Sequence, residues 1–440
     1  MHRRKKISGR KREQGVVITL VAVFMLFVVG AMAALSIDVV TIYTARSEAQ
    51  LAADGAALAG ARVLANSGMT SDPNAVSDGL MSNAQTLASA VATQVAGQNT
   101  VGGAIPTSIN VSFGGNPPTN PAVTVRVQNT DLPTFFARIW GTTRLTVGAS
   151  ATAEAYNPSG ANALNGATVP VAPICVKPWL LPNMDPTNGN NPIFATATGA
   201  INSGSNLLGW PNSGATRLRT DCMACTANSA PTAWRYYPGT TDVAGDFPPP
   251  AASSCTGCGA FTNYQLSIAG CVQTPISCSS PAASPVHVDT TNYPTRDTET
   301  GTAVTDLTHA TANAGDSVDT AVASPPSGNE PFQFLAGGDN PVVQSGALAS
   351  GADIVISDSL VTVPVINVDK GTPVPLPGFP AFQIIGFVQL FLSPTGLAAP
   401  GSGHIHTRVI NMAGCGTGAS ATPILGNGAS PVAVRLISPP

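Results

Sequence analysis

The sequence is poor in charged and aromatic residues. Of its 440 residues, 10 % are Asp, Glu, Lys or Arg and 5 % are Phe, Trp or Tyr. Soluble domains typically carry about 25 % charged residues, so the composition argues against a compact cytosolic enzyme. Small residues and turn formers are abundant instead, including 44 Gly and 38 Pro. This mixture favours an exported protein that is rich in β-strands.

Familiar catalytic and phosphate-binding motifs are missing as well. The sequence contains no Gly-x-Ser-x-Gly, no His-Glu-x-x-His and no Gly-x-x-x-x-Gly-Lys, the patterns of serine hydrolases, zinc proteases and P-loops. Acidic residues outnumber basic ones after the N-terminus, so nucleic acid is not an expected partner. We therefore expect a protein that is not an enzyme and has no catalytic residue and no cofactor.

One long uncharged segment follows a basic N-terminus. Residues 1–13 contain seven Lys or Arg and one Glu, whereas residues 14–37 contain no charge. An α-helix needs about 20 apolar residues to cross the hydrocarbon core of a membrane. We predict a basic cytoplasmic head at 1–13 and a transmembrane helix at 14–37, with the N-terminus inside. A cleaved signal peptide, whose apolar region would be about 7–15 residues long, is the alternative.

The helical pattern continues beyond the predicted span. Residues 38–66 are rich in alanine, the best helix former, and no proline occurs before Pro73. We predict a stalk helix over 38–66 and interpret Asp38 as a residue at the membrane boundary. Gly55 and Gly60 would let another helix approach closely. That helix belongs either to the same chain or to a partner subunit, and both interpretations stay open.

Residues 67–156 predict a small α+β domain next to the stalk. Its expected elements are a helix at 80–95 and strands at 108–113, 123–128 and 144–156. Asp131 is expected to cap a short helix that runs through Ile139 and ends at Gly141. We expect Phe135 and Phe136 in the core of this domain.

The remaining residues predict a sandwich-like, β-rich exported region at 170–440, after a linker at 157–169. Alternating or continuous apolar patterns between Gly/Pro turns predict strands at 352–356, 360–368, 383–392, 404–410 and 432–437. Residues 280–330 are rich in Ser, Thr, Pro, Ala and Asp. We expect them to form a long loop or flexible insertion.

All eight cysteines lie in this β-rich region. The pairs Cys222-x-x-Cys225 and Cys255-x-x-Cys258 have the form of a zinc ribbon, although the 29 residues between them exceed the usual gap of roughly 15–20. Outside the cytoplasm thiols are oxidised, and each disulfide would stabilise a segment with little core by about 2–4 kcal/mol. We predict at least two disulfides here, with the two pairs closed locally or bridged to each other. Zinc at these four thiolates is the alternative.

Two histidines form a second, weaker candidate for metal binding. His404 and His406 alternate along a predicted strand, so both rings would point to one face. No carboxylate lies near them in the sequence, and we predict no metal at this pair.

The N-terminal residues resemble a known family. The pattern comprises Gln14-Gly15, the apolar span, Ile37-Asp38-Val39, Tyr43, Ala45-Arg46, Gln50-Leu51, Ala53-Asp54 and Ala56–Ala61. It is similar to the N-terminal segment of the TadE/TadG-like proteins of bacterial Tad (Flp) pilus-assembly systems. Residues 132–141, 360–366 and 384–392 also resemble parts of these proteins.

Two differences from members of this family indicate which type of member the chain resembles. Processed prepilins carry a Glu five residues after the Gly at the cut, whereas the fifth residue after Gly15 is Leu20. The basic head is therefore expected to be retained, as in a TadG-type membrane anchor. Some TadG-type proteins contain a von Willebrand A module with an Asp-x-Ser-x-Ser motif, which is missing here.

The resemblance implies a structural role in assembling a Tad (Flp)-type pilus or a related envelope machine. The chain would sit in the bacterial cytoplasmic membrane with its bulk in the periplasm or outside the cell. Its helix over 16–66 would contact other pilus-assembly or pilin-like subunits. Two other functions stay open: an exported adhesin for cell adhesion, and an exported metal-binding protein that uses the paired cysteines.

Overall fold

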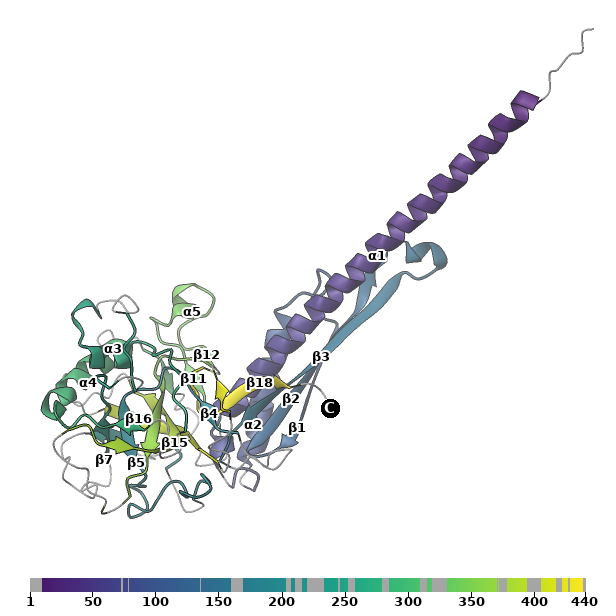
Figure 1. The fold of residues 1–440 in the computed structure, drawn as a ribbon. Coiled ribbons are helices and arrows are strands. Elements are labelled where there is room, and N and C mark those ends of the chain that lie inside the picture. The colour runs from purple at the N-terminus through teal and green to yellow at the C-terminus, as the bar shows by residue number, and fades with distance from the viewer. Residues whose placement is uncertain are drawn as a thin grey trace, which may run out of the picture. The chain divides into compact units, whose positions relative to one another are not determined.

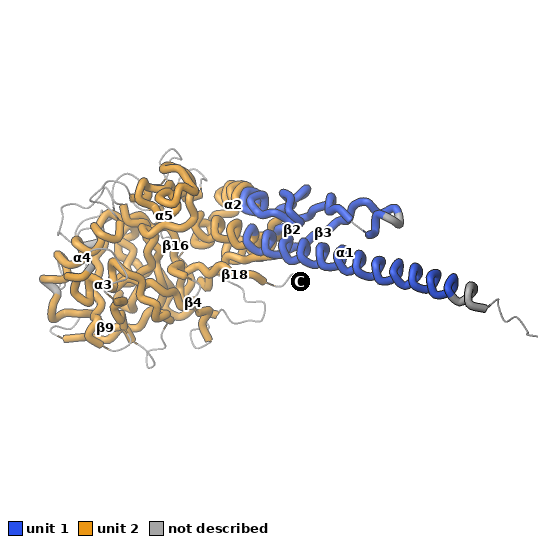
Figure 2. Tube along the Cα trace, turned by 90° about the horizontal axis from the view of Figure 1, so that it is seen from above, with its two compact units in different colours: residues 1–56, 93–111, 125–151 blue, residues 57–92, 112–124, 152–440 orange. Residues whose placement is uncertain are grey.

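The computed structural model of the chain describes residues 10–72, 74–77, 79–134, 136–159, 169–202, 207–209, 216–219, 233–243, 246–251, 258–278, 285–308, 315–318, 331–369, 371, 378–393, 405–416, 422–425 and 428–437 (Figure 1). These residues divide into two compact units, which Figure 2 distinguishes by colour. Unit 1 takes its residues from 1–56, 93–111 and 125–151, and unit 2 from 57–92, 112–124 and 152–440. The domain boundaries expected from the sequence stay predictions.

One uninterrupted helix, α1 (Arg10–Asn66), contains both the predicted span and the predicted stalk. Its most apolar 18-residue stretch is wholly unburied, and the helix from Gly15 onwards is long and apolar enough to cross a membrane. The prediction of a long N-terminal apolar helix is confirmed. The role of residues 38–66 as a projecting stalk stays a prediction.

After a short 3₁₀ helix, η1 (Met69–Ser71), the chain forms α2 (Leu80–Gly97) and the first sheet. The sheet has the order β1-β2-β3-β18, with β1 (Ser108–Asn116), β2 (Asn120–Pro133), β3 (Arg144–Tyr156) and β18 (Ala433–Ile437). The predicted helix and strands are all present. The C-terminal strand β18 runs antiparallel to β3, with Ala433 opposite Tyr156.

The prediction that Asp131 caps a helix is wrong. Strand β2 continues to Pro133, so Asp131 is a strand residue, and only a short 3₁₀ helix, η2 (Ala137–Trp140), follows. Gly141 does end it, in the left-handed conformation that glycine adopts without strain. Phe136, expected in the core, is half-buried, and Phe135 lies outside the described residues.

Unit 2 is built on a seven-stranded sheet with the order β7-β6-β16-β15-β13-β5-β8. The strands are β5 (Trp179–Pro182), β6 (Thr216–Arg219), β7 (Ala233–Arg235), β8 (Tyr237–Pro238), β13 (Leu360–Ile366), β15 (Ile384–Leu392) and β16 (Ile405–Gly414). All nine residues of β15 are buried. Both faces of the sheet are therefore covered there, which matches the continuous apolar run in its sequence.

Before, between and after the strands of this sheet, the chain also forms several small sheets and short helices. They are β4 (Val171–Ala172) with β17 (Ile424–Leu425), β9 (Val286–His287) with β14 (Ala381–Phe382), and β10 (Ser317–Val318), β11 (Phe334–Leu335) and β12 (Asp353–Ile354). The helices are η4 (Cys258–Ala260), α3 (Asn263–Ala269), α4 (Tyr293–Leu307) and α5 (Pro341–Gln344). The β-rich character predicted for 170–440 is confirmed, and the sandwich-like arrangement stays a prediction.

The expectation of a loop over 280–330 is wrong for residues 293–307, which form α4. Asn292 precedes the helix and a proline occupies its first turn, a position where the missing N–H costs nothing. The helix packs against α3. Tertiary contact therefore stabilises a segment whose composition alone is typical of a loop.

Candidate functional site

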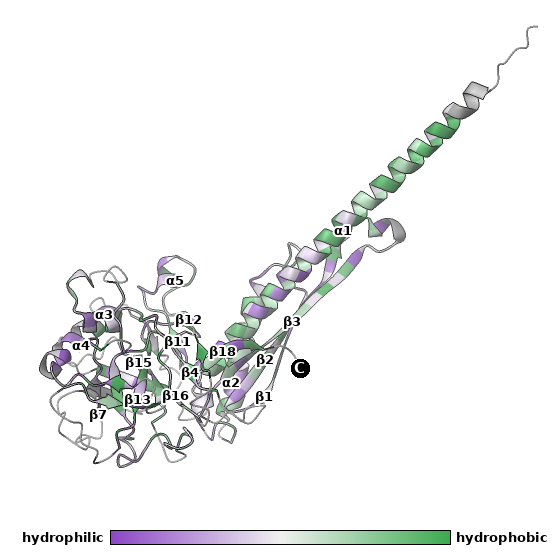
Figure 3. Ribbon diagram, in the orientation of Figure 1, coloured by the Kyte–Doolittle hydropathy of each residue, from purple (hydrophilic) through white to green (hydrophobic). Residues whose placement is uncertain are grey.

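The first part of α1 exposes large apolar side chains that pack against nothing in the described chain. Leu26 and Phe27, in the middle of the apolar run, are 75 % and 73 % exposed. Figure 3 shows this part of α1 as a continuous hydrophobic stretch. Leaving such surface in water costs about 25 cal/mol for each Å². The segment therefore requires an apolar surrounding, which a lipid bilayer supplies.

No residue from 15 to 37 is buried, and Asp38 is the first buried residue that follows them on α1. This carboxylate is only 4 % exposed, and it lies directly after the uncharged run. Its Oδ2 accepts hydrogen bonds from the backbone N–H groups of Phe136, at 2.8 Å, and Ala137, at 2.9 Å. Both donors belong to the first turn of η2, whose own N-cap makes no side-chain hydrogen bond. Asp38 therefore caps this helix from α1 and is more than a boundary residue.

A second carboxylate on α1 makes a similar bond ten residues later. Glu48 Oε2 accepts a hydrogen bond of 2.7 Å from the backbone N–H of Gly102. Gly102 has a φ of +64°, and a Cβ there would collide with the side chain of Leu132. Two acidic residues of α1 thus hold two separate loops of unit 1 at different heights along the helix.

Further along, α1 becomes a tightly packed helix of small residues. Eight alanines between Ala45 and Ala65 are buried. Gly60, on the same helix, lies against α2 and β2. A Cβ on Gly60 would meet Val123 Cγ1 at 3.1 Å and Ala92 Cβ at 3.3 Å. The close approach that Gly60 allows is therefore made by α2 and β2 of the same chain. The opposite face of α1 keeps Tyr43 and Leu51 exposed, at 77 % and 69 %.

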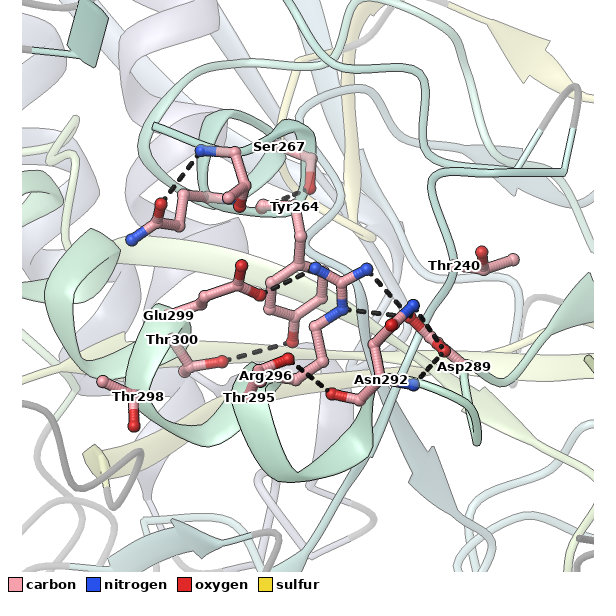
Figure 4. Close-up of polar contacts among 12 residues, drawn as sticks. Thr240, Tyr264, Ser267, Asp289, Asn292, Thr295, Arg296, Thr298, Glu299 and Thr300 are labelled. Atoms are coloured by element: carbon pink, nitrogen blue, oxygen red, sulfur yellow. Dashed lines mark hydrogen bonds and ion pairs between the residues drawn. The ribbon is translucent and has the colours of Figure 1, made fainter. Parts of the chain in front are cut away.

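A buried charge cluster joins α3 and α4 in unit 2 (Figure 4). Arg296 donates from Nε and Nη2 to Asp289 Oδ2, at 3.0 and 2.9 Å, and from Nη1 to Glu299, at 2.7 Å. Its guanidinium also lies 4.7 Å from the ring centre of Tyr264. Burial alone would lower the pKa of Arg296, but the ion pairs with Glu299 and Asp289 together outweigh it and raise that pKa. The guanidinium is paired on every side, which indicates a structural role in holding α4.

A buried lysine closes the other end of α3. Lys177 Nζ donates hydrogen bonds to the carbonyl oxygens of Ile268 and Gly270, at the C-terminal end of the helix. Burial lowers the pKa of this amine to about 7. A disulfide between Cys175 and Cys271 joins the residues that flank these contacts. Together they fix the end of α3, since the N–H donors of a lysine near a helix C-terminus satisfy its last carbonyls.

The disulfides predicted for this region are confirmed in part. Cys175 pairs with Cys271 and Cys278 with Cys415, across 96 and 137 residues. Each bond has one end in the Cys222–Cys278 segment and the other outside it. Cys222, Cys225 and Cys255 lie outside the described residues, as does the side chain of Cys258. Whether these four cysteines pair with one another or bind zinc therefore stays a prediction.

The histidine pair is also only half described. His406 is half-buried on β16, and His404 lies outside the described residues. Among the residues that the structure describes, no group of three or more His, Cys, Asp or Glu side chains could hold a metal ion. The sequence signalled none of the long-range partners found here, because Asp38, Lys177 and Arg296 are ordinary charged residues in it.

The comparison with known families falls on α1. Residues 15–63 match the family model described as Putative Flp pilus-assembly TadE/G-like. No curated protein and no solved structure matches the chain. The matched residues include the exposed apolar stretch, Asp38, Glu48 and Gly60. The chain therefore carries a TadE/G-like pilus-assembly segment on a helix that can anchor it in a membrane.

Proposed function

We propose that the chain is a membrane-anchored structural component of a Tad (Flp)-type pilus-assembly apparatus or a related envelope machine. The carrying observation is that the TadE/G-like match coincides with α1. This helix exposes an apolar stretch of membrane-spanning length and then packs into the folded chain. Within the family, the retained head and the lack of an Asp-x-Ser-x-Ser motif favour a TadG-type anchor without a von Willebrand A module.

The N-terminus lies in the cytoplasm and the folded remainder on the outer face of the cytoplasmic membrane. Seven basic residues precede the span, and basic flanks stay on the cytoplasmic side. The two disulfides support the same orientation, because such bonds persist in oxidising compartments. The protein acts as a scaffold and not as an enzyme, and the face of α1 that carries Tyr43 and Leu51 contacts pilin-like subunits.

The test is complementation of an in-frame deletion in the native host. Deletion is expected to abolish surface pili, counted by electron microscopy, and the full chain is expected to restore them. A matched form replaces residues 1–37 with a cleavable secretion signal, so that the folded remainder is exported without its anchor. It is expected to form its disulfides yet fail to restore pili. Normal piliation in the deletion strain would refute the role in assembly.

A further inference from the structure

The turn between β2 and β3 occupies a defined height along α1. Asp38 is the first residue after the uncharged run, and its carboxylate binds the backbone of Phe136 and Ala137. All of these residues belong to unit 1, and Figures 1 and 2 both show the ends of β2 and β3 beside α1. The turn is therefore held at the point where α1 leaves the apolar run.

This height corresponds to the surface of a bilayer. The 22 residues from Val16 to Ile37 form about 33 Å of helix, close to the hydrocarbon thickness of about 30 Å. If they fill that core, Asp38 enters the headgroup layer, which is roughly 5–7 Å thick on each side. Tyr43, exposed on α1, lies about 7 Å further along the axis, at the outer limit of the layer.

The residue types of the turn suit that layer. Residues 136–140 read Phe-Ala-Arg-Ile-Trp, in a chain that has only 5 % aromatic residues. Arg138 is exposed. Tryptophan, the type of residue 140, is enriched at the headgroup level of membranes, and arginine pairs with phosphate through its planar guanidinium. Position and composition are independent observations, and they agree.

We propose that the β2–β3 turn, residues 136–141, is a contact surface for phospholipid headgroups on the outer face of the membrane. Asp38 positions it by capping η2, so that the turn rests on the bilayer beside the exit of α1. With two points of support, the helix and the turn, unit 1 cannot tilt freely about the span. The proposal rests on the membrane anchorage in the proposed function and requires nothing of the pilus role.

The test places a photoreactive amino acid, p-benzoylphenylalanine, at Arg138 in the full chain in native membranes. The matched control is Ile105, which is also exposed in unit 1. Its loop is held near Glu48 through Gly102, about 15 Å beyond Asp38 along the helix. Mass spectrometry after irradiation is expected to find phospholipid adducts at 138 at least five-fold above those at 105. Equal labelling, or adducts at 138 with protein alone, would overturn the proposal.

Two substitutions at Asp38 separate positioning from mere folding. Asp38→Asn keeps an acceptor oxygen and is expected to retain most of the lipid labelling at 138. Asp38→Ala leaves the two N–H groups without this acceptor and is expected to reduce it several-fold. Alkaline extraction of the same membranes reports anchorage. A chain that stays in the membrane fraction without labelling at 138 contradicts the turn contact alone, whereas loss of the chain from that fraction contradicts the anchor itself.

Discussion

The two parts of α1 are one continuous helix in two different surroundings. From Val16 to Ile37 most side chains are large and apolar, and most of these are exposed, with Leu26 and Phe27 as examples. From Asp38 to Asn66 the inward face is buried and is made mainly of alanine, with Val63 and Leu64 joining it near the end of the helix. Large apolar residues can be solvated by lipid, whereas small ones let backbones approach closely. Residue size, and not hydrophobicity alone, thus distinguishes the part that meets the membrane from the part that meets the protein.

The largest expected effect comes from placing charge in the first part. Leu26→Arg with Phe27→Arg should cost about 3 kcal/mol for each substitution at the centre of a span and strongly reduce insertion. Tyr43→Arg with Leu51→Arg changes two equally exposed residues beyond the span and should leave insertion intact. Alkaline phosphatase fused after the last residue measures both, because it is active only outside the cytoplasm. Equal activity in the two double variants would show that the exposed apolar stretch is not the anchor.

A smaller effect is expected where the helix is packed. In Gly60→Leu, the new side chain meets Val123 and Ala92, which lie 3.1 and 3.3 Å from the position of its Cβ. Overpacking of this kind costs about 1–3 kcal/mol, so the melting temperature of the purified chain should fall. Gly30→Leu is the matched control, since a Cβ at Gly30 has no neighbour within 4 Å. A comparable fall for both variants would contradict the difference between the two parts of α1.

Elements with a strong local pattern were predictable from the sequence. The alanine-rich continuation of α1 and the apolar run of β15 carry their own periodicity or burial signal. Strand β3 begins and ends at the predicted residues. These elements are specified by residues that are close together in the sequence, so the pattern of this one sequence is enough to predict them.

What the sequence did not reveal depends on distant partners. The cap of η2 comes from Asp38, 98 residues before Phe136, so Asp131 was the wrong candidate. Helix α4 is stabilised by the burial of Arg296 against Asp289 and Tyr264, which its loop-like composition conceals. Cysteine spacing cannot show that Cys278 pairs with Cys415, 137 residues away. The sequence indicated that Asp38 lies at the end of the uncharged run. Only the structure shows that its carboxylate accepts hydrogen bonds from Phe136 and Ala137.

The smallest effect concerns the second carboxylate on α1. Glu48→Ala removes the acceptor for the N–H of Gly102, which lies 2.7 Å away. A hydrogen bond of this kind contributes about 0.5–1.5 kcal/mol, and the value should fall at the low end because Gly102 is exposed and water can replace the acceptor. The melting temperature should therefore change little, while hydrogen exchange at the Gly102 amide should accelerate several-fold. Ser47→Ala, at the exposed neighbouring position, should leave that amide unchanged. Acceleration in both variants would mean that α1 holds this loop by packing and not through Glu48.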